Sequence, residues 1–251
     1  MNRVHLISLI MIISVTASLI SAGFETNTNG INKDTGSSLQ QAIEFYQQKR
    51  FNEAETIFAV LLNSDPTNQE IAVWAALNYL ELKKNEESLK CIEKALKAEP
   101  NSLSLRKMQA KINIAMKEYS VAEDILEETV ELNQNDTGIW QMLSYVNLSQ
   151  KDFKYAIEAA DKAIQIDSRN INSYLYKGYS LLGRKKFEMA ISVFDEALKI
   201  QPGNKAIMKG RELAIKVYRE FKGSRKTDKP VQIDLYQQII DANPDAAGIP
   251  L

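Results

Sequence analysis

The sequence predicts an all-α protein in which helical hairpins stack in series. Helix formers such as Leu, Ala, Glu and Lys are abundant, whereas the 251 residues contain only 6 Pro and 10 Gly. A pattern of small and bulky residues also recurs every 34 residues from Thr35 to Asn204, through five frames without an insertion. One helical hairpin cannot bury its apolar stripe alone, so hairpins at a fixed period are expected to stack into a continuous core.

The composition argues against most catalytic and nucleic-acid-binding functions. Lys and Arg total 31 against 32 Asp and Glu, so no broad basic field is present to attract nucleic acid. The only histidine is His5, which leaves the rest of the chain without the usual base of Ser-His and Cys-His hydrolases. The only cysteine is Cys91, which we expect to be a small buried residue, with pairing between chains as the alternative. We therefore expect no enzyme, no metal and no cofactor.

Residues 1–24 are typical of a signal peptide or membrane anchor. Arg3 precedes an uncharged apolar run over 6–20, and the small residues at 21–23 permit cleavage after Gly23. The uncharged span 4–24 is also just long enough to cross a bilayer, so cleavage and anchoring both remain open, with a buried core helix as a third alternative. With Arg3 on the cytoplasmic side, the repeats are expected outside the cytoplasm, either secreted or periplasmic after cleavage or membrane-anchored.

Residues 25–34 are predicted to be a polar linker. They contain few apolar side chains, and the polar composition continues to Ser38, so this segment is not expected to fold alone.

The five frames share small residues where two helices must approach and bulky residues that fill the space between them. Position 8 is always small: Ala42, Ala76, Ala110, Ser144 and Gly178. Position 20 is small as well: Ala54, Ser88, Ala122, Ala156 and Ala190. Position 24 is bulky in Phe58, Ile92, Leu126 and Phe194, with Ala160 as the exception. Position 32 is Pro in Pro66, Pro100 and Pro202, which ends the second helix and lets the next hairpin begin.

These residues resemble the tetratricopeptide repeat, and Trp140 and Tyr174 supply the aromatic residue that this family places at position 4. The resemblance covers 35–204 and implies a right-handed α-solenoid of five helix-turn-helix repeats. Their bounds are 35–68, 69–102, 103–136, 137–170 and 171–204.

Two further segments follow the repeats. Residues 205–221 are predicted to be a capping helix, because they combine an apolar side with a charged outer face. Residues 222–251 are predicted to be a flexible tail with a short amphipathic segment over 231–240. That segment is either loosely ordered or a peptide that occupies a groove of its own chain or of a neighbouring chain.

The resemblance implies a partner-binding groove lined by the first helix of each repeat. Positions 2, 5, 9 and 12 would point into it, and positions 5 and 9 give Val73, Leu77, Lys107, Lys111, Gln141, Tyr145, Leu175 and Tyr179. Lys107 and Lys111 lie one turn apart and would hold an acidic side chain or a C-terminal carboxylate, with a solvated helix face as the alternative. Leu39 and Ile43 occupy these positions in the first repeat, so recognition of chaperone tails is not expected.

The third repeat has faces of opposite charge. Its second helix carries Glu123, Asp124, Glu127, Glu128 and Glu131. A polar outer face explains this pattern, and a docking surface for a basic partner is the alternative.

The resemblance favours a non-catalytic scaffold that binds a peptide or helix of a partner protein. The alternative is a structural protein in which repeats stack between chains. Residues 178–185 differ from a phosphate-binding loop, because Arg184 occupies the position of the required Lys and no Ser or Thr follows Lys185. Nucleotide binding is therefore not expected.

Overall fold

The computed structural model describes residues 31–224, and within this range all regular structure is α-helical. The first helices of successive hairpins are α2 (Ile31–Gln47), α4 (Gln69–Glu81), α6 (Leu103–Ala115), α8 (Thr137–Ser149) and α10 (Ile171–Gly183). Their partners are α3 (Phe51–Ser64), α5 (Asn85–Ala98), α7 (Tyr119–Leu132), α9 (Phe153–Ile166) and α11 (Phe187–Ile200), and α12 (Lys205–Ser224) follows them. None of the described helices is both long and apolar enough to cross a membrane.

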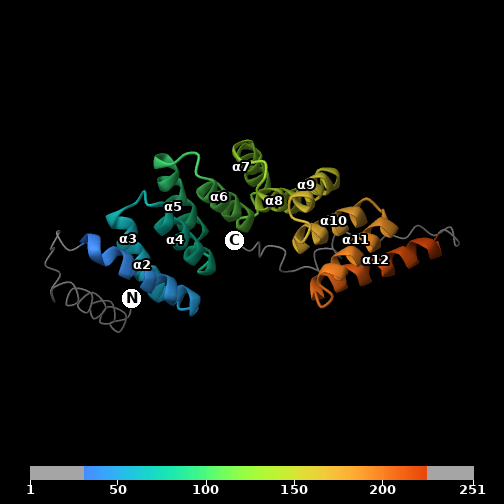
Figure 1. Cartoon of the computed structure of the whole chain (residues 1–251), viewed down its shortest axis with the longest axis horizontal. Coiled ribbons are helices and arrows are strands. Elements are labelled where there is room, and N and C mark those ends of the chain that lie inside the picture. The colour runs from blue at the N-terminus through green and yellow to red at the C-terminus, as the bar shows by residue number, and fades with distance from the viewer. Residues whose placement is uncertain (1–30, 225–251) are drawn as a thin grey trace, which may run out of the picture.

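The hairpins follow one another along the long axis of the molecule, from blue α2 to orange α12 (Figure 1). This arrangement confirms the predicted all-α solenoid. The leader predicted over 1–24 and the tail segment 231–240 lie outside the described residues.

The helix starts repeat with the period of the sequence. From α4 onward, each first helix begins at the first residue of a frame, and each second helix begins sixteen residues later. One boundary differs, because α2 begins at Ile31 and thus includes residues 31–34 of the predicted linker. Polar residues extend a helix that is already packed, since each added residue gains a hydrogen bond without a new nucleus. Similarly, α12 continues to Ser224, beyond the predicted end at 221.

The last residue of every frame caps the helix that follows. These caps are Asn68, Ser102, Asp136, Asn170 and Asn204. In each case the side-chain oxygen accepts a hydrogen bond from the backbone N–H three residues later, at 3.0 to 3.3 Å. The cap satisfies one of the N–H groups that a helix start leaves unpaired.

The turn within each hairpin contains a lysine in the left-handed region. The five residues are Lys49, Lys83, Lys117, Lys151 and Lys185, with φ between 56° and 69°. Glycine adopts this backbone conformation at a lower cost than lysine, yet lysine occupies the position in every frame. All five side chains are exposed or partly exposed.

The core is built from the small and bulky positions that define the period. Position 20 and position 24 are fully buried in all five frames. The fifth frame shows how tightly they fit, because a Cβ added to Gly178 would lie 2.4 Å from the Phe194 ring. A Cβ on Gly210 of α12 would approach the same ring to 2.8 Å. Phe194 is therefore held between the backbones of α10 and α12, which fixes α12 against the last repeat.

The buried residues form two clusters that meet at α6. The N-terminal core extends from α2 to α6 and includes Phe58 and Met108. The C-terminal core extends from α6 to α12 and includes Tyr179 and Phe194. Helix α6 contributes to both, since Met108 packs into the first and Ile114 into the second. The solenoid thus has two cores joined through one helix.

Candidate partner-binding surface

The eight predicted groove residues divide into two groups according to their exposure. Val73 and Leu77 of α4 and Lys107 and Lys111 of α6 are partly exposed. The four from α8 and α10 are buried: Gln141 is 7% exposed, Tyr145 6%, Leu175 5% and Tyr179 0%. In this structure a partner can reach the side chains of the first group only.

The α4 part of this surface is of mixed polarity, with an aromatic border. Val73 and its neighbour Trp74 line a cavity of about 340 Å³ together with the polar residues Gln69, Glu70 and Ser104. The Trp74 ring packs edge-to-face on Tyr46 of α2, with 5.7 Å between ring centroids. Leu77 lies one helical turn beyond Val73. Apolar and aromatic side chains of this kind anchor partner segments well.

Lys107 is held by the residue that caps the first helix of the next repeat. Its Nζ lies 2.7 Å from Oδ2 of Asp136, and both side chains are less than one-third exposed. The other carboxylate oxygen of Asp136 caps α8 by accepting a hydrogen bond from the N–H of Ile139. Lys107 therefore links the third repeat to the start of the fourth and is not free to pair with a ligand in this structure.

Gln141 makes the equivalent link one repeat later. Its Oε1 accepts a hydrogen bond of 2.9 Å from Nδ2 of Asn170, the residue that caps α10. Position 5 thus binds the cap of the following repeat in two successive frames. Sequence reasoning missed this role, although the Asn, Ser or Asp at the end of each frame is a recognisable cap signal.

Lys111 has no such link. Among the described residues its ammonium makes no hydrogen bond and no ion pair. Partial burial lowers the pKa of Lys111, and the carboxylate of Glu81 opposes that effect by raising it. Lys111 is therefore a partly desolvated cation that makes no ion pair with a carboxylate within residues 31–224.

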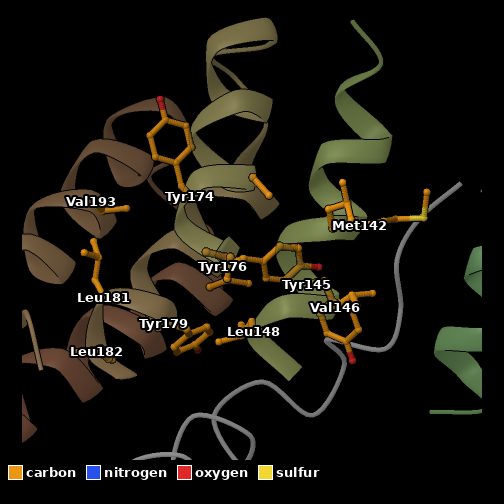
Figure 2. Packing of buried hydrophobic residues seen from close by; sticks show 14 of the residues in the cluster. Met142, Tyr145, Val146, Leu148, Tyr174, Tyr176, Tyr179, Leu181, Leu182 and Val193 are labelled. Carbon is orange, nitrogen blue, oxygen red and sulfur yellow. The ribbon is translucent and has the colours of Figure 1, made fainter. Parts of the chain in front are cut away.

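Tyrosine rings fill the corresponding region of α8 and α10. Figure 2 shows Tyr145 of α8 meeting Tyr176 of α10, and their ring centroids are 5.5 Å apart. Tyr145 also packs edge-to-face on Tyr119 of α7, with 6.4 Å between ring centroids. Burial raises the pKa of Tyr176, so that its hydroxyl stays neutral.

Tyr179 belongs to the C-terminal core. Its ring packs edge-to-face on Phe194 at 5.7 Å, and burial raises its pKa to about 12. Among the described residues its hydroxyl oxygen has no hydrogen-bond partner. The family pattern assigned Tyr179 to the groove, but its side chain fills the space between α10 and α11.

Cys91 is buried, as expected, and is 6% exposed in the N-terminal core. Burial raises the pKa of its thiol from an ordinary value of 9.0 to about 12. The thiol is therefore protonated near neutral pH and poorly nucleophilic. In the described part of the chain, no group of three His, Cys, Asp or Glu side chains could hold a metal ion.

Comparison with known protein families identifies two matching regions. A model of anaphase-promoting complex, cyclosome, subunit 3 matches residues 47–129. A model of the tetratricopeptide repeat matches 137–170 and 171–204, the fourth and fifth frames. No curated protein sequence matches this chain.

Several solved structures share the fold. A MamA protein is 21% identical with a TM-score of 0.59, covering 68% of this chain and 93% of that one. A thermophilic TPR protein of Thermus thermophilus is 15% identical with a TM-score of 0.60, covering 72% and 98%. YrrB, described as a TPR protein with an unusual peptide-binding site, is 19% identical with a TM-score of 0.58, covering 75% and 98%. The repeat pattern, the two family matches and the shared fold agree, and the chain belongs to the tetratricopeptide-repeat family.

Proposed function

We propose that this protein is a non-catalytic scaffold that binds a partner protein on the α4 and α6 face, outside the cytoplasm. The observation that carries the proposal is the environment of Lys111, a partly buried ammonium without an ion pair in the described part of the chain. Partial burial removes part of the hydration of this ammonium, and a carboxylate from a partner would compensate for that loss. The peptide-binding site named for YrrB supports the use of this fold for such a role.

The side chains near Lys111 define the chemistry of the proposed partner. Val73 and Leu77 are partly exposed apolar residues on the adjacent first helix. Lys107 is already paired with Asp136, so Lys111 is the cation that remains for the ligand. A segment with an acidic residue next to an apolar one fits this surface, and a C-terminal carboxylate is one form that the acid can take.

Photo-crosslinking tests the location of the surface. A photo-reactive residue at position 77 should capture a partner in the native host, whereas one at position 60 should not. Val60 is a suitable control because it is 64% exposed on α3. Equal capture of the same partner from both positions would contradict the proposal.

Substitution of Lys111 tests the chemistry. Lys111→Gln should weaken binding of the captured partner on the order of tenfold to a hundredfold, while Lys111→Arg should retain most of it. Lys111→Glu should abolish binding, because it also repels the acidic ligand. Circular dichroism of each variant would show that the fold is intact. Unchanged affinity of folded Lys111→Gln would overturn the role of this residue.

The location outside the cytoplasm rests on the sequence of residues 1–24, which precede the described residues. Cell fractionation and N-terminal sequencing of the mature protein test it. A chain that begins at Phe24 supports cleavage, and an intact leader in the membrane fraction supports anchoring. Recovery of the full-length chain in the cytoplasm would contradict export.

Self-assembly is the second candidate function, and one row of side chains favours it. Val121, Tyr155 and Met189 occupy position 19 of three successive frames and are 46%, 56% and 53% exposed. An apolar row on the second helices of successive repeats can mark an interface between copies. Light scattering should then show a mass that rises with concentration and falls after Met189→Lys. A constant monomer mass would exclude this candidate.

A further inference from the structure

A second surface, distinct from the α4 and α6 face, contains a pocket between α7, α8 and α9. Its volume is about 330 Å³. Helix α7 contributes Glu123 and Glu127, α8 contributes Trp140, and α9 contributes Tyr155 and Glu158. One cation, Lys162, also lines it. Three carboxylates against one ammonium give the pocket a negative charge.

The three carboxylates differ in how well they are paired. Glu123 accepts a hydrogen bond of 2.6 Å from the side-chain amide of Gln150. Glu158 lies 3.8 Å from Nζ of Lys154 in a loose, exposed pair. Glu127 has no ion pair or hydrogen bond within residues 31–224. The pocket therefore retains acceptor capacity for an external donor.

A buried amide in the pocket wall has an unpaired acceptor. Asn147 of α8 lines the pocket and is 4% exposed. Its Nδ2 donates to the carbonyl of Leu143 at 3.0 Å, but its Oδ1 has no hydrogen-bond partner among the described residues. An unpaired buried acceptor is costly and uncommon, and this oxygen has almost no solvent-accessible surface, so a ligand donor would reach it, and be favourable there, after the Asn147 amide rotates toward the pocket.

The aromatic residues provide surfaces on which a cation can stack. The indole N–H of Trp140 already donates to the carbonyl of Gln134 at 2.8 Å, which leaves the ring for packing. Tyr155 is 56% exposed, and the ammonium of Lys154 lies 5.3 Å from its ring centroid. This distance is within the range of a cation–π contact, and the exposed Tyr155 ring is accessible to a cation.

We propose that this pocket binds an arginine side chain of a partner protein. A guanidinium has five N–H donors in one plane. These donors can serve two carboxylates and the side-chain oxygen of Asn147 while the face of the guanidinium stacks on an aromatic ring. Two further acids of α7, Asp124 and Glu131, extend the negative charge along the helix and favour an arginine within a basic segment, whereas Glu128 is already paired with Arg106 at 3.0 Å. The paired cap residues and the Lys111 surface have no part in this site.

Fluorescence provides a direct test, because the chain contains two tryptophans and one of them lines the pocket. In a Trp74→Phe background, Trp140 is the only tryptophan. The probe is the peptide acetyl-(Gly-Arg)4-amide, and its control is the same peptide with citrulline, a neutral residue of nearly the same shape. We expect the arginine peptide to change Trp140 emission in a saturable way and the citrulline peptide to have no effect.

Two double variants with the same change in charge separate the pocket from the general field of α7. Glu127→Gln with Glu158→Gln removes two pocket carboxylates, whereas Asp124→Asn with Glu131→Gln removes two that do not line it. The pocket variant should bind the arginine peptide at least about tenfold more weakly, and the control variant less than about threefold. Tyr155→Ala should also weaken binding. Lys111→Glu should leave it unchanged, which separates this site from the proposed function.

Three results would overturn the proposal. Equal losses in the two double variants would show that only the long-range field of α7 attracts the peptide. Equal binding of the citrulline peptide would exclude a role for the positive charge. A protein that is dimeric by light scattering and becomes monomeric in the pocket variant would identify the occupant as a second copy of this chain.

Discussion

The N-terminal and C-terminal halves of the solenoid share one repeat geometry but differ in the surface that their first helices present. In α4 and α6, positions 5 and 9 are partly exposed aliphatic residues and lysines. In α8 and α10, the same positions carry glutamine, leucine and two tyrosines, all of them buried. The backbone period therefore sets where a groove can form, and the side chains decide which part of it a partner can reach.

The two halves also have separate cores. A substitution in one core, which has the largest expected effect on the free energy of unfolding, tests whether the two cores unfold independently. Phe194→Ala should destabilise the C-terminal core by about 3 to 5 kcal/mol, because it leaves a cavity between three helices. Urea unfolding of single-tryptophan variants distinguishes the halves, since Trp74 reports on the first and Trp140 on the second. The Trp140 transition should move to lower urea much more than the Trp74 transition.

Phe58→Ala is the matched variant in the N-terminal core, where Phe58 is also fully buried. In this variant the urea transition reported by Trp74 should move more than the transition reported by Trp140. If both probes move together in both variants, the two cores unfold as one unit and α6 couples them strongly.

The next effect concerns the close approach of α10 to α11. Gly178→Ala should cost about 1 to 3 kcal/mol, because its new methyl group would overlap the Phe194 ring. In a Phe194→Leu background the added cost should be smaller, since the side chain opposite is smaller and more flexible. Thermal unfolding of the two single variants and the double variant measures this coupling. Additive costs would show that the ring moves aside without strain.

A smaller effect tests the links between repeats. Lys107→Met removes the ion pair with Asp136, and Asp136→Asn removes the charge but keeps a capping acceptor. A double-mutant cycle of these changes should give a coupling of about 0.2 to 1 kcal/mol, as is usual for partly exposed pairs. The coupling should fall in high salt. A coupling of zero would mean that Lys107 is available to a partner.

The last test changes no residue and uses alkylation of the Cys91 thiol to report on the N-terminal core. Its raised pKa of about 12 means that the folded thiol stays protonated between pH 8 and 10, whereas an unfolded thiol with an ordinary pKa of 9.0 ionises over this range. Alkylation of the folded protein should therefore be slow, and that of urea-unfolded protein should be at least about a hundredfold faster and rise with pH. Phe194→Ala should leave the protection of Cys91 unchanged if the cores are independent. Fast labelling of the folded protein would show that the N-terminal core opens readily.

The fold could be predicted from the sequence because each frame carries its own packing requirements. Small residues at position 20 and bulky ones at position 24 specify one close helix pair, and five repetitions in phase leave little ambiguity. The start of α2 was less predictable, because polar residues such as those at 31–34 carry no apolar period to mark a boundary.

The candidate site was only partly predictable. The family pattern indicates the direction of positions 5 and 9, but it does not specify which neighbouring residues cover them. Tyr145 contacts Tyr119 and Tyr176, which lie in different repeats, and these contacts exist only after stacking. The link from Lys107 to Asp136 spans 29 residues and depends in the same way on how two frames meet. The α7 acids were visible in the sequence, but the pocket that they share with Trp140 and Tyr155 was not.

The position of Phe194 between Gly178 and Gly210 limits the order in which this chain can change over generations. A larger residue at either glycine is harmful while the aromatic ring is present, and a smaller residue at 194 leaves a void while both glycines remain. Substitutions at these three sites are therefore expected to accumulate in a particular order. Phe194 would be replaced by a smaller residue before either glycine is replaced by a larger one. The last repeat and its capping helix would then be inherited as one unit.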